Sequence, residues 1–155
     1  MVWFPAARID QLISEDVPYL DLTSEVLGVA DQPGEMEYYT REDCVLAGVE
    51  VVKAIAKHLG CTVAEARADG DRVVAGESFM VLQGPASALH QVWKVGLNTF
   101  DHLSAVATKT RQMVDAAHAV NPRCEILTTR KSMPGAKDLL TLGVRAGGAW
   151  PHRLG

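Results

Sequence analysis

The chain has 155 residues, a formal net charge of -4 and 48% hydrophobic residues, a composition typical of one globular domain. Its mildly acidic balance offers no basic surface for nucleic acid or a membrane, and its apolar runs are too short to span a bilayer. The residues before Pro5 are too few for a signal peptide, so we expect a cytoplasmic protein whose widely separated cysteines form neither disulfides nor a zinc site.

The first half of the chain predicts a small α+β unit. Apolar residues at helical spacing indicate helices over 8–16 and 48–59. Short β-prone runs between turn residues predict strands over 36–40, 44–46, 62–67, 73–74 and 79–82. The acidic segment 15–24 invites a metal-binding interpretation, but its spacing is not that of a calcium loop. We expect a loop there, in which Asp21 and Thr23 cap local turns.

From residue 87 to about residue 120 the pattern is helical. The predicted core face carries Leu89, Val92, Trp93, Gly96, Leu97, Phe100, Leu103 and Ala107. A second, polar face is either exposed to solvent or forms the wall of a polar pocket. Its members are Lys94, Asn98, Asp101 and His102. The small residues at 104–108 predict a bend or a break in this helix.

The last segment predicts a strand, a helix and a second strand. The first strand covers 124–128, Ser132 caps a helix whose first turn holds Pro134, and the glycines at 147–148 end that helix. Its apolar positions are Ala136, Leu139, Leu140, Gly143 and Val144. A β–α–β unit places both strand ends at one edge of a parallel sheet or barrel, where α/β folds bind their ligands.

Two cationic pairs follow these strands, Arg130-Lys131 and His152-Arg153. Two like unit charges about 6 Å apart repel by about 3 kcal/mol at an effective dielectric near 20. Either the side chains point apart into solvent, or an anion lies among them. The residues alone leave both interpretations open.

These motifs resemble a known family. Residues 129–135 (TRKSMPG), followed by 144–148 (VRAGG) and 152–155 (HRLG), resemble the quinolinate phosphoribosyltransferases, also called nicotinate-nucleotide pyrophosphorylases. Further similar stretches are Asp21–Thr23, Val45–Gly48, Asp69–Asp71 and Leu97–Ser104. The resemblance covers essentially the whole chain. It is strongest to the ModD-type branch associated with molybdenum uptake, because of Glu15–Tyr19, Pro151 before the His-Arg pair, and Lys94 where other members have Arg.

The resemblance implies transfer of a phosphoribosyl group from phosphoribosyl pyrophosphate to quinolinate, with nicotinate mononucleotide, pyrophosphate and CO2 as products. By the resemblance, six residues bind the acid's carboxylates and the neighbouring phosphate: Lys94, Thr129, Arg130, Lys131, His152 and Arg153. Lys131 is also the catalytic residue that the resemblance implies. Lys94 reaches from the long helix into the site of its own subunit or into that of a partner subunit. A homodimer or higher homo-oligomer is therefore expected. Mg²⁺ accompanies the phosphoribosyl donor, with its ligands outside this chain.

The implied fold is an N-terminal α/β sandwich over 1–119, followed over 120–155 by the first βαβ part of an α/β barrel. Because the barrel is incomplete, we expect a truncated chain that is inactive alone and leaves apolar residues such as Leu127 and Val144 poorly covered. Two alternatives stay open. One is a non-catalytic anion-binding or assembly module linked to molybdate uptake, and the other is a purely structural domain.

Overall fold

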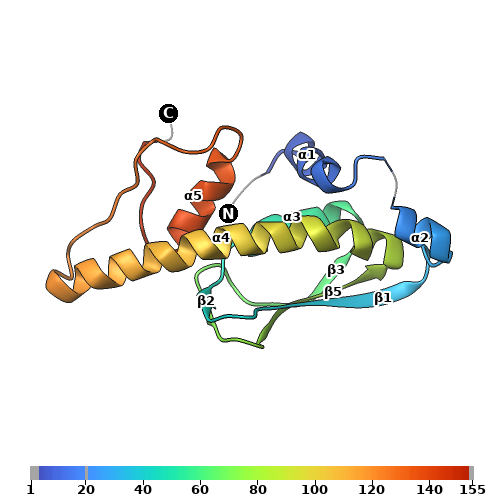
Figure 1. Ribbon diagram of the computed structural model, residues 1–155, viewed down its shortest axis with the longest axis horizontal. Helices are drawn as coiled ribbons and strands as arrows, with labels where there is room; N and C mark the ends of the chain where they lie inside the picture. The colour runs from blue at the N-terminus through green and yellow to red at the C-terminus, as the bar shows by residue number, and fades with distance from the viewer. Residues whose placement is uncertain (1–3, 20, 154–155) are drawn as a thin grey trace. The chain divides into compact units, whose positions relative to one another are not determined.

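The computed structural model describes residues 4–19 and 21–153. Its elements are α1 (Ala6–Asp16), α2 (Leu22–Leu27), β1 (Pro33–Tyr39), β2 (Cys44–Val45), α3 (Val49–His58), β3 (Thr62–Ala66), β4 (Arg72–Val73), β5 (Ser78–Pro85), α4 (Ala86–Val120) and α5 (Lys137–Ala146). They form two compact units, and α4 contributes to both (Figure 1). No helix of the described part is long and apolar enough to cross a membrane.

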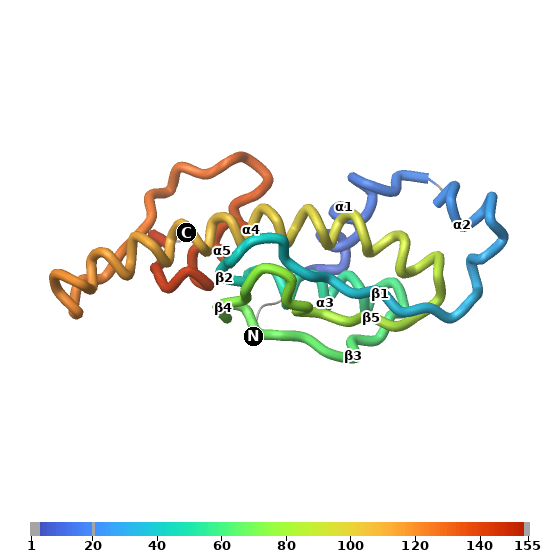
Figure 2. The backbone as a smooth tube through the Cα atoms, turned by 60° about the horizontal axis from the view of Figure 1, so that its bottom comes forward, coloured from blue at the N-terminus to red at the C-terminus, as the bar shows by residue number. Residues whose placement is uncertain are grey.

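Unit 1 comprises Met1–Tyr39, Val49–Arg67 and Glu77–Thr99. Its sheet has the antiparallel order β1-β5-β3, and α3 and the first part of α4 pack on one face of it (Figures 1 and 2). The predicted core face of α3 is confirmed, since Val51, Val52 and Ile55 are fully buried. Gly60 follows α3 with φ 84°, a left-handed conformation that glycine adopts without strain.

A close helix-to-sheet approach fixes α4 in unit 1. The hydroxyl of Tyr38 on β1 donates to the carbonyl of Val92 at 2.9 Å. A Cβ atom added at Gly96 would lie 2.2 Å from that hydroxyl oxygen, so only glycine fits beneath the tyrosine. Trp93, which the sequence pattern placed on the core face, is instead 53% exposed, so that prediction was wrong. Its neighbour Val92 takes the inward position.

Unit 2 comprises Thr40–Gly48, Ala68–Gly76 and Phe100–Gly155. The predicted break at 104–108 is absent, because α4 is one continuous helix through this region. Its small polar residues hold the chain next to β2 instead. The backbone N–H of Val45 donates to Thr108 Oγ1 at 2.8 Å, and that of Ala47 donates to Ser104 Oγ at 3.1 Å. These hydroxyls satisfy one backbone donor of β2 and one just beyond the end of the short β2–β4 pair.

Helix α5 begins three residues later than the sequence pattern predicted. Gly135 has φ 81°, which a right-handed helix does not accept, so Pro134 lies before the helix. The N-cap is Ala136 without a side-chain hydrogen bond, and the expected cap at Ser132 is therefore wrong. The predicted end at the two glycines is confirmed, because α5 stops at Ala146 and Gly148 has φ 92°.

The predicted strand over 124–128 is reduced to one parallel bridge between Leu127 and Trp150. Around it, Thr128 donates to the carbonyl of Trp150 at 3.0 Å, and Trp150 donates to that of Ile126 at 2.9 Å. The parallel pairing of two segments joined by a crossover helix is as expected. The pairing is limited to this one bridge and does not extend into a longer strand ladder. Leu127 is 62% exposed, in agreement with the expectation that this surface is poorly covered.

Candidate anion-binding site

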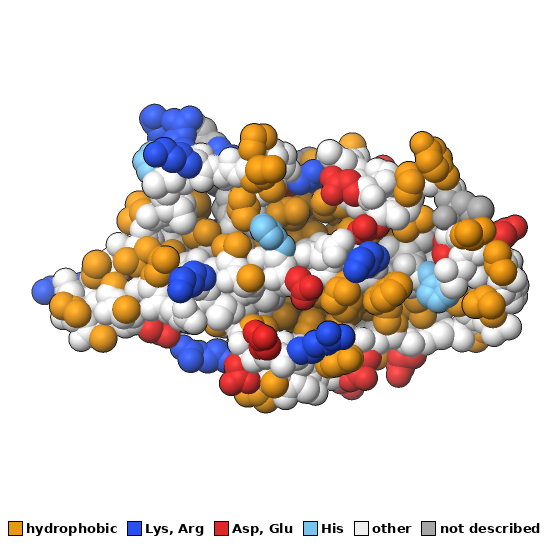
Figure 3. Space-filling model, viewed as in Figure 1, with side chains coloured by type: hydrophobic (Ala, Val, Ile, Leu, Met, Phe, Trp, Pro, Cys, Tyr) orange, Lys and Arg blue, Asp and Glu red, His pale blue; other side chains and the backbone are white. Residues whose placement is uncertain are grey.

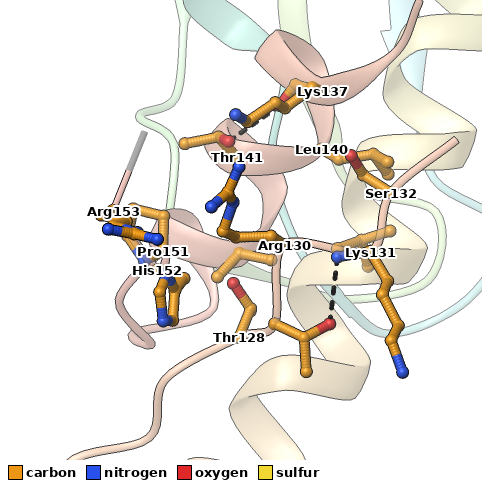
Figure 4. A pocket seen from close by; sticks show the side chains of 13 residues that line it. Thr128, Arg130, Lys131, Ser132, Lys137, Leu140, Thr141, Pro151, His152 and Arg153 are labelled. Atoms are coloured by element: carbon orange, nitrogen blue, oxygen red, sulfur yellow. Dashed lines mark hydrogen bonds between the residues drawn. The ribbon is translucent and has the colours of Figure 1, made fainter. Parts of the chain in front are cut away.

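A hollow of about 210 Å³ lies in unit 2 at the predicted edge (Figure 4). Four segments form it: α4 at Val106, the chain after the first bridge strand, one side of α5, and the chain after Trp150. The lining residues are Val106, Thr128, Thr129, Arg130, Lys131, Ser132, Lys137, Leu140, Thr141, Val144, Pro151, His152 and Arg153. Five of the six residues predicted for the site line this one hollow, although about twenty residues separate the two groups in sequence.

The lining of this hollow is cationic. Arg130, Lys131, Lys137 and Arg153 contribute four formal positive charges, and His152 adds another when protonated. Among its lining residues, all of which the structure describes, there is no carboxylate. The cations are exposed, so water screens their mutual repulsion. An anion in this position would relieve the repulsion and gain several charge-assisted hydrogen bonds.

Adjacent cations of the first pair point in different directions. In Figure 4 the Arg130 side chain extends toward Thr141 and Lys137 of α5, whereas Lys131 extends to the other side of the backbone. The hydroxyl of Thr129 accepts a hydrogen bond from the backbone N–H of Lys131 at 3.2 Å, so it fixes this local turn.

The second cationic pair follows a segment that several contacts hold in place. Arg111 on α4 donates to the carbonyl of Ala146 at 3.4 Å, at the end of α5. The indole N–H of Trp150 donates to Glu125 at 3.0 Å, and the Arg145 guanidinium lies 5.5 Å from the centre of the Trp150 ring. The chain is therefore positioned immediately before His152 and Arg153.

Sequence reasoning missed three polar residues of the hollow: Ser132 as a lining group, Lys137 and Thr141. Thr141 donates to the carbonyl of Lys137 at 2.8 Å, within the first turns of α5. The position of Lys137 was predictable in principle, because the first turn of a crossover helix lies at the same edge as the preceding strand end.

Lys94 does not line this hollow. It lines a second one, of about 550 Å³, which lies entirely within unit 1. The lining residues there are Asp21, Thr23, Gly34, Glu35, Met36, Ala86, Leu89, His90, Trp93 and Lys94. On the same polar face of α4, Asn98 donates to Asp16 at 3.2 Å. The role predicted for Lys94 in the acid's site stays a prediction.

A three-residue cluster borders the second hollow. Asp21 caps α2 by accepting from the backbone N–H of Ser24 at 3.4 Å, and it also accepts from the Ser24 hydroxyl. His90 Nδ1 lies 2.8 Å from that hydroxyl and 3.2 Å from Asp21 Oδ2. Burial acts to raise the pKa of Asp21, but the Ser24 hydrogen bonds and the charge of His90 outweigh it and hold the pKa below its usual value. The expected cap at Asp21 is confirmed, but the last three residues of the predicted loop, 22–24, begin helix α2.

Replacing Asp21 with asparagine tests this cluster. Because the folded-state pKa is lowered, the carboxylate's contribution is complete above the unfolded-state value near 3.9 and is lost as pH falls through the folded-state value. We expect Asp21→Asn to lower the free energy of unfolding by about 1 kcal/mol at pH 6. Urea denaturation should show the difference shrinking toward pH 2.5. The control Asp31→Asn, at an exposed site, should change little at either pH. A pH-independent difference would show that the Asp21 charge contributes nothing.

The described residues offer no ready metal site. No group of three or more His, Cys, Asp or Glu side chains among them could hold a metal ion. Mg²⁺ prefers carboxylate and water oxygens, and the cationic hollow has no carboxylate in its described lining. The residues present therefore do not fit a protein-bound Mg²⁺ ion.

Comparison with known sequences defines the class of protein. The family description "Quinolinate phosphoribosyl transferase, N-terminal domain" matches residues 21–104, and its C-terminal counterpart matches residues 106–155. The chain belongs to the quinolinate phosphoribosyl transferase family. The two matches meet within α4; the boundary expected between residues 119 and 120 stays a prediction.

Among individual relatives, the chain is similar to proteins named pyrophosphorylase ModD. It is 39% identical to that of Rhodobacter capsulatus over 144 residues, covering 93% of this chain and 56% of the relative. With that of Escherichia coli O6:H1 the identity is 33% over 155 residues, covering 100% of this chain and 55% of the relative. A protein named nicotinate-nucleotide pyrophosphorylase (carboxylating) from Methanothermobacter thermautotrophicus is 34% identical over 146 residues, covering 94% and 52%. The chain thus spans about half the length of the curated relatives it matches.

Solved structures support the fold. A NadC deletion mutant matches with a TM-score of 0.90 and 25% identity, covering 100% of this chain and 57% of that one. NadC from Streptococcus pyogenes matches with a TM-score of 0.86 and 24% identity, covering 100% and 56%, a likeness that concerns the fold alone. The predicted fold class is confirmed: an α+β sandwich-like part is followed by the first βαβ part of an α/β barrel.

Proposed function

We propose that this chain supplies the acid-binding part of a phosphoribosyltransferase of the quinolinate type, acting on quinolinate or on a closely related acid. The observation that carries the proposal is the hollow of unit 2. There, cations from segments around Arg130 and Arg153 line one space with no carboxylate in it. Membership of the quinolinate phosphoribosyl transferase family supplies the reaction class.

In the proposed reaction, the ring nitrogen of the acid forms a bond to C1 of the phosphoribosyl group. The bond between C1 and pyrophosphate breaks, and pyrophosphate leaves with the electron pair. The carboxyl group next to the ring nitrogen then departs as CO2, and a proton takes its place on the ring. Cations placed around the acid and the leaving group orient both and stabilise the charge that develops as pyrophosphate departs.

Each predicted residue has a role in this proposal. Arg130 and Arg153 bind carboxylate or phosphate oxygens through their planar guanidinium groups, and Lys131 and His152 add charge and hydrogen-bond donors. Thr129 supports the acid through a contact from its hydroxyl or its backbone. Mg²⁺ would accompany the phosphoribosyl donor and be held outside the described lining of this chain. A cytoplasmic location belongs to the same proposal.

Lys94 is proposed to contribute to the site of a partner subunit in a homodimer or larger homo-oligomer. Lys94 lines the hollow of unit 1 and is not among the lining residues of the cationic hollow, which is compatible with that role. A lysine presents a point charge where an arginine would grip a carboxylate through two parallel hydrogen bonds. We therefore propose an acceptor acid that needs less directional recognition at this position than quinolinate does.

The activity can be tested by measuring nicotinate mononucleotide and pyrophosphate formed from quinolinate and phosphoribosyl pyrophosphate. We expect no product from the 155-residue chain and product from a longer polypeptide that includes the remaining barrel of the relatives. Arg130→Gln in the long form should abolish most of the activity, whereas Arg123→Gln, an exposed arginine of the same unit, should preserve it. A long form that turns over neither quinolinate nor related pyridine acids would contradict the proposal.

A second candidate function is a non-catalytic anion-binding or assembly module linked to molybdate uptake. The cationic, carboxylate-free lining also suits a doubly charged oxyanion such as molybdate. Calorimetric titration separates the two candidates. Binding of pyrophosphate and quinolinate favours the transferase, and binding of molybdate alone favours the module.

A further inference from the structure

The hollow of unit 1 has a lining of a different kind from that of the cationic hollow. Its volume of about 550 Å³ lies within the range of small-molecule sites, roughly 300–1,000 Å³. Its walls are the N-terminal end of α2 with the cap before it, the start of β1 and the start of α4. All three belong to unit 1, so the whole lining lies within one compact unit.

The α4 wall of this hollow is amphipathic. Leu89 and Trp93 are four residues apart, as are His90 and Lys94, so these side chains form two neighbouring rows on the helix. Leu89 is buried, but Trp93 is half exposed. Together with Met36 on β1, the indole gives the hollow an apolar and partly aromatic surface. Such a surface beside a few polar groups is the usual composition of a small-molecule site.

The two carboxylates of the lining have partners within the chain. Glu35 accepts a hydrogen bond from the side-chain amide of Gln83 at 2.8 Å. Asp21 accepts from the backbone N–H of Ser24 and lies 3.2 Å from Nδ1 of His90. These contacts hold both carboxylates in place and leave them negatively charged within the lining.

Three hydrogen-bond donors of the same lining are open to a ligand. They are the ammonium group of Lys94, the indole N–H of Trp93 and the hydroxyl of Thr23. None of these three groups has a hydrogen bond or an ion pair with any residue that the structure describes. The open groups include one positive charge, and the negative charges of the lining already have partners. A ligand that fits them therefore offers acceptor oxygens.

The chemistry of the lining selects one class of ligand. A carboxylate accepts a charge-assisted hydrogen bond from an ammonium group such as that of Lys94. A planar aromatic ring packs favourably on an indole such as that of Trp93. A second ionised group on the ligand would share the hollow with Asp21 and Glu35, whose like charges repel it. The lining therefore favours a monocarboxylate over a dicarboxylate or a phosphate compound.

We propose that the hollow of unit 1 binds a planar aromatic monocarboxylate, with the ring against Trp93 and the carboxylate on Lys94. The inference does not rest on the proposed function, which depends on the cationic hollow of unit 2. The ligand has two sources of the same chemistry. One is an acceptor acid with a single carboxylate, and the other is a separate aromatic acid that takes no part in the transfer.

An NMR titration of the ¹⁵N-labelled 155-residue chain with sodium benzoate tests the inference. We expect saturable shifts of the amide signals of residues 86–94, at the start of α4. Cyclohexanecarboxylate keeps the charge but lacks the aromatic ring, and benzyl alcohol keeps the ring but lacks the charge. Each should bind more weakly than benzoate, because each lacks one of the two features that the lining recognises.

Single variants assign the two contacts. Trp93→Leu should weaken benzoate binding about three- to tenfold and remove the preference for benzoate over cyclohexanecarboxylate. Trp93→Phe keeps an aromatic ring and should restore most of that preference. Lys94→Gln should weaken benzoate binding about two- to fivefold without affecting benzyl alcohol. Lys57→Gln, which removes an exposed lysine of α3 outside this lining, should behave like the parent chain.

Benzoate shifts confined to unit 2, or a preference for benzoate that survives Trp93→Leu, would overturn this inference. Neither result affects the proposed function, which is tested with pyrophosphate and by product formation. Kinetics of the longer polypeptide distinguish the two sources of the ligand. Trp93→Leu raises KM for an acceptor acid that occupies the hollow, and it leaves KM unchanged where the occupant is a separate aromatic acid.

Discussion

Replacing Gly147 with alanine should lower the free energy of unfolding by about 3 kcal/mol, the upper range for overpacking a closely packed contact. An added Cβ atom would lie 2.4 Å from Thr110 Cβ and 2.6 Å from the carbonyl oxygen of Ala107, both on α4. The obstructing atoms include backbone, which cannot move aside as a flexible side chain does. The end of α5 would have to move away from α4, and the segment leading to His152 and Arg153 would move with it.

Urea denaturation followed by circular dichroism measures this effect. The backbone of Gly147 has φ -70°, so alanine meets no conformational penalty there and the loss reports the contact alone. Gly76→Ala in the same unit is the control for backbone strain without a packing clash. Gly76 has φ 83° and no atom within 4 Å of an added Cβ, so alanine should cost about 1 kcal/mol through backbone strain. A Gly147→Ala loss no larger than that of Gly76→Ala would show that the packing of α5 on α4 is looser than described.

Removing either arginine of the cationic hollow should weaken pyrophosphate binding by at least tenfold. Arg130 and Arg153 come from segments on either side of α5, and each can offer two parallel N–H donors to one phosphate group. Glutamine keeps much of the side-chain length but removes the charge and the fork of donors. Calorimetric titration of Arg130→Gln and Arg153→Gln gives the two losses separately.

Arg123→Gln serves as the control for these variants, since it removes an exposed arginine of the same unit that does not line the hollow. The affinity of the parent chain should also fall as salt concentration rises, because exposed charges are screened. Equal binding by the parent chain, Arg130→Gln and Arg153→Gln would show that the hollow is not the binding site.

Several elements could be predicted from the sequence because their signals are local and strong. The apolar spacing of α3 and α4 places Ile55 and Leu103 in the core, and the glycines after α5 mark its end. Convergence of the two cationic pairs followed from a topological rule, since strand ends joined through a crossover helix share an edge. In contrast, α2 has only six residues, too few for a periodic pattern to distinguish it from a loop.

The remaining differences depend on tertiary contacts that periodicity does not encode. Trp93 and Val92 are adjacent on α4, and the pattern could not tell that Val92 alone faces the core. The late start of α5 depends on the left-handed backbone of Gly135, which a glycine permits but does not require. The direction of Lys131 depends on the local bend at Arg130, so its position beside Arg130 in the sequence did not reveal that the two side chains diverge.

The central claim is that cations from two segments distant in sequence hold one multiply charged anion. An NMR titration of the ¹⁵N-labelled chain with sodium pyrophosphate tests it most directly. We predict that the amide signals of Arg130, Lys137 and Arg153 shift together along one saturable curve with a single dissociation constant, while those of unit 1 stay in place. Shifts confined to one of the two segments, or no saturable shift in either, would contradict the claim.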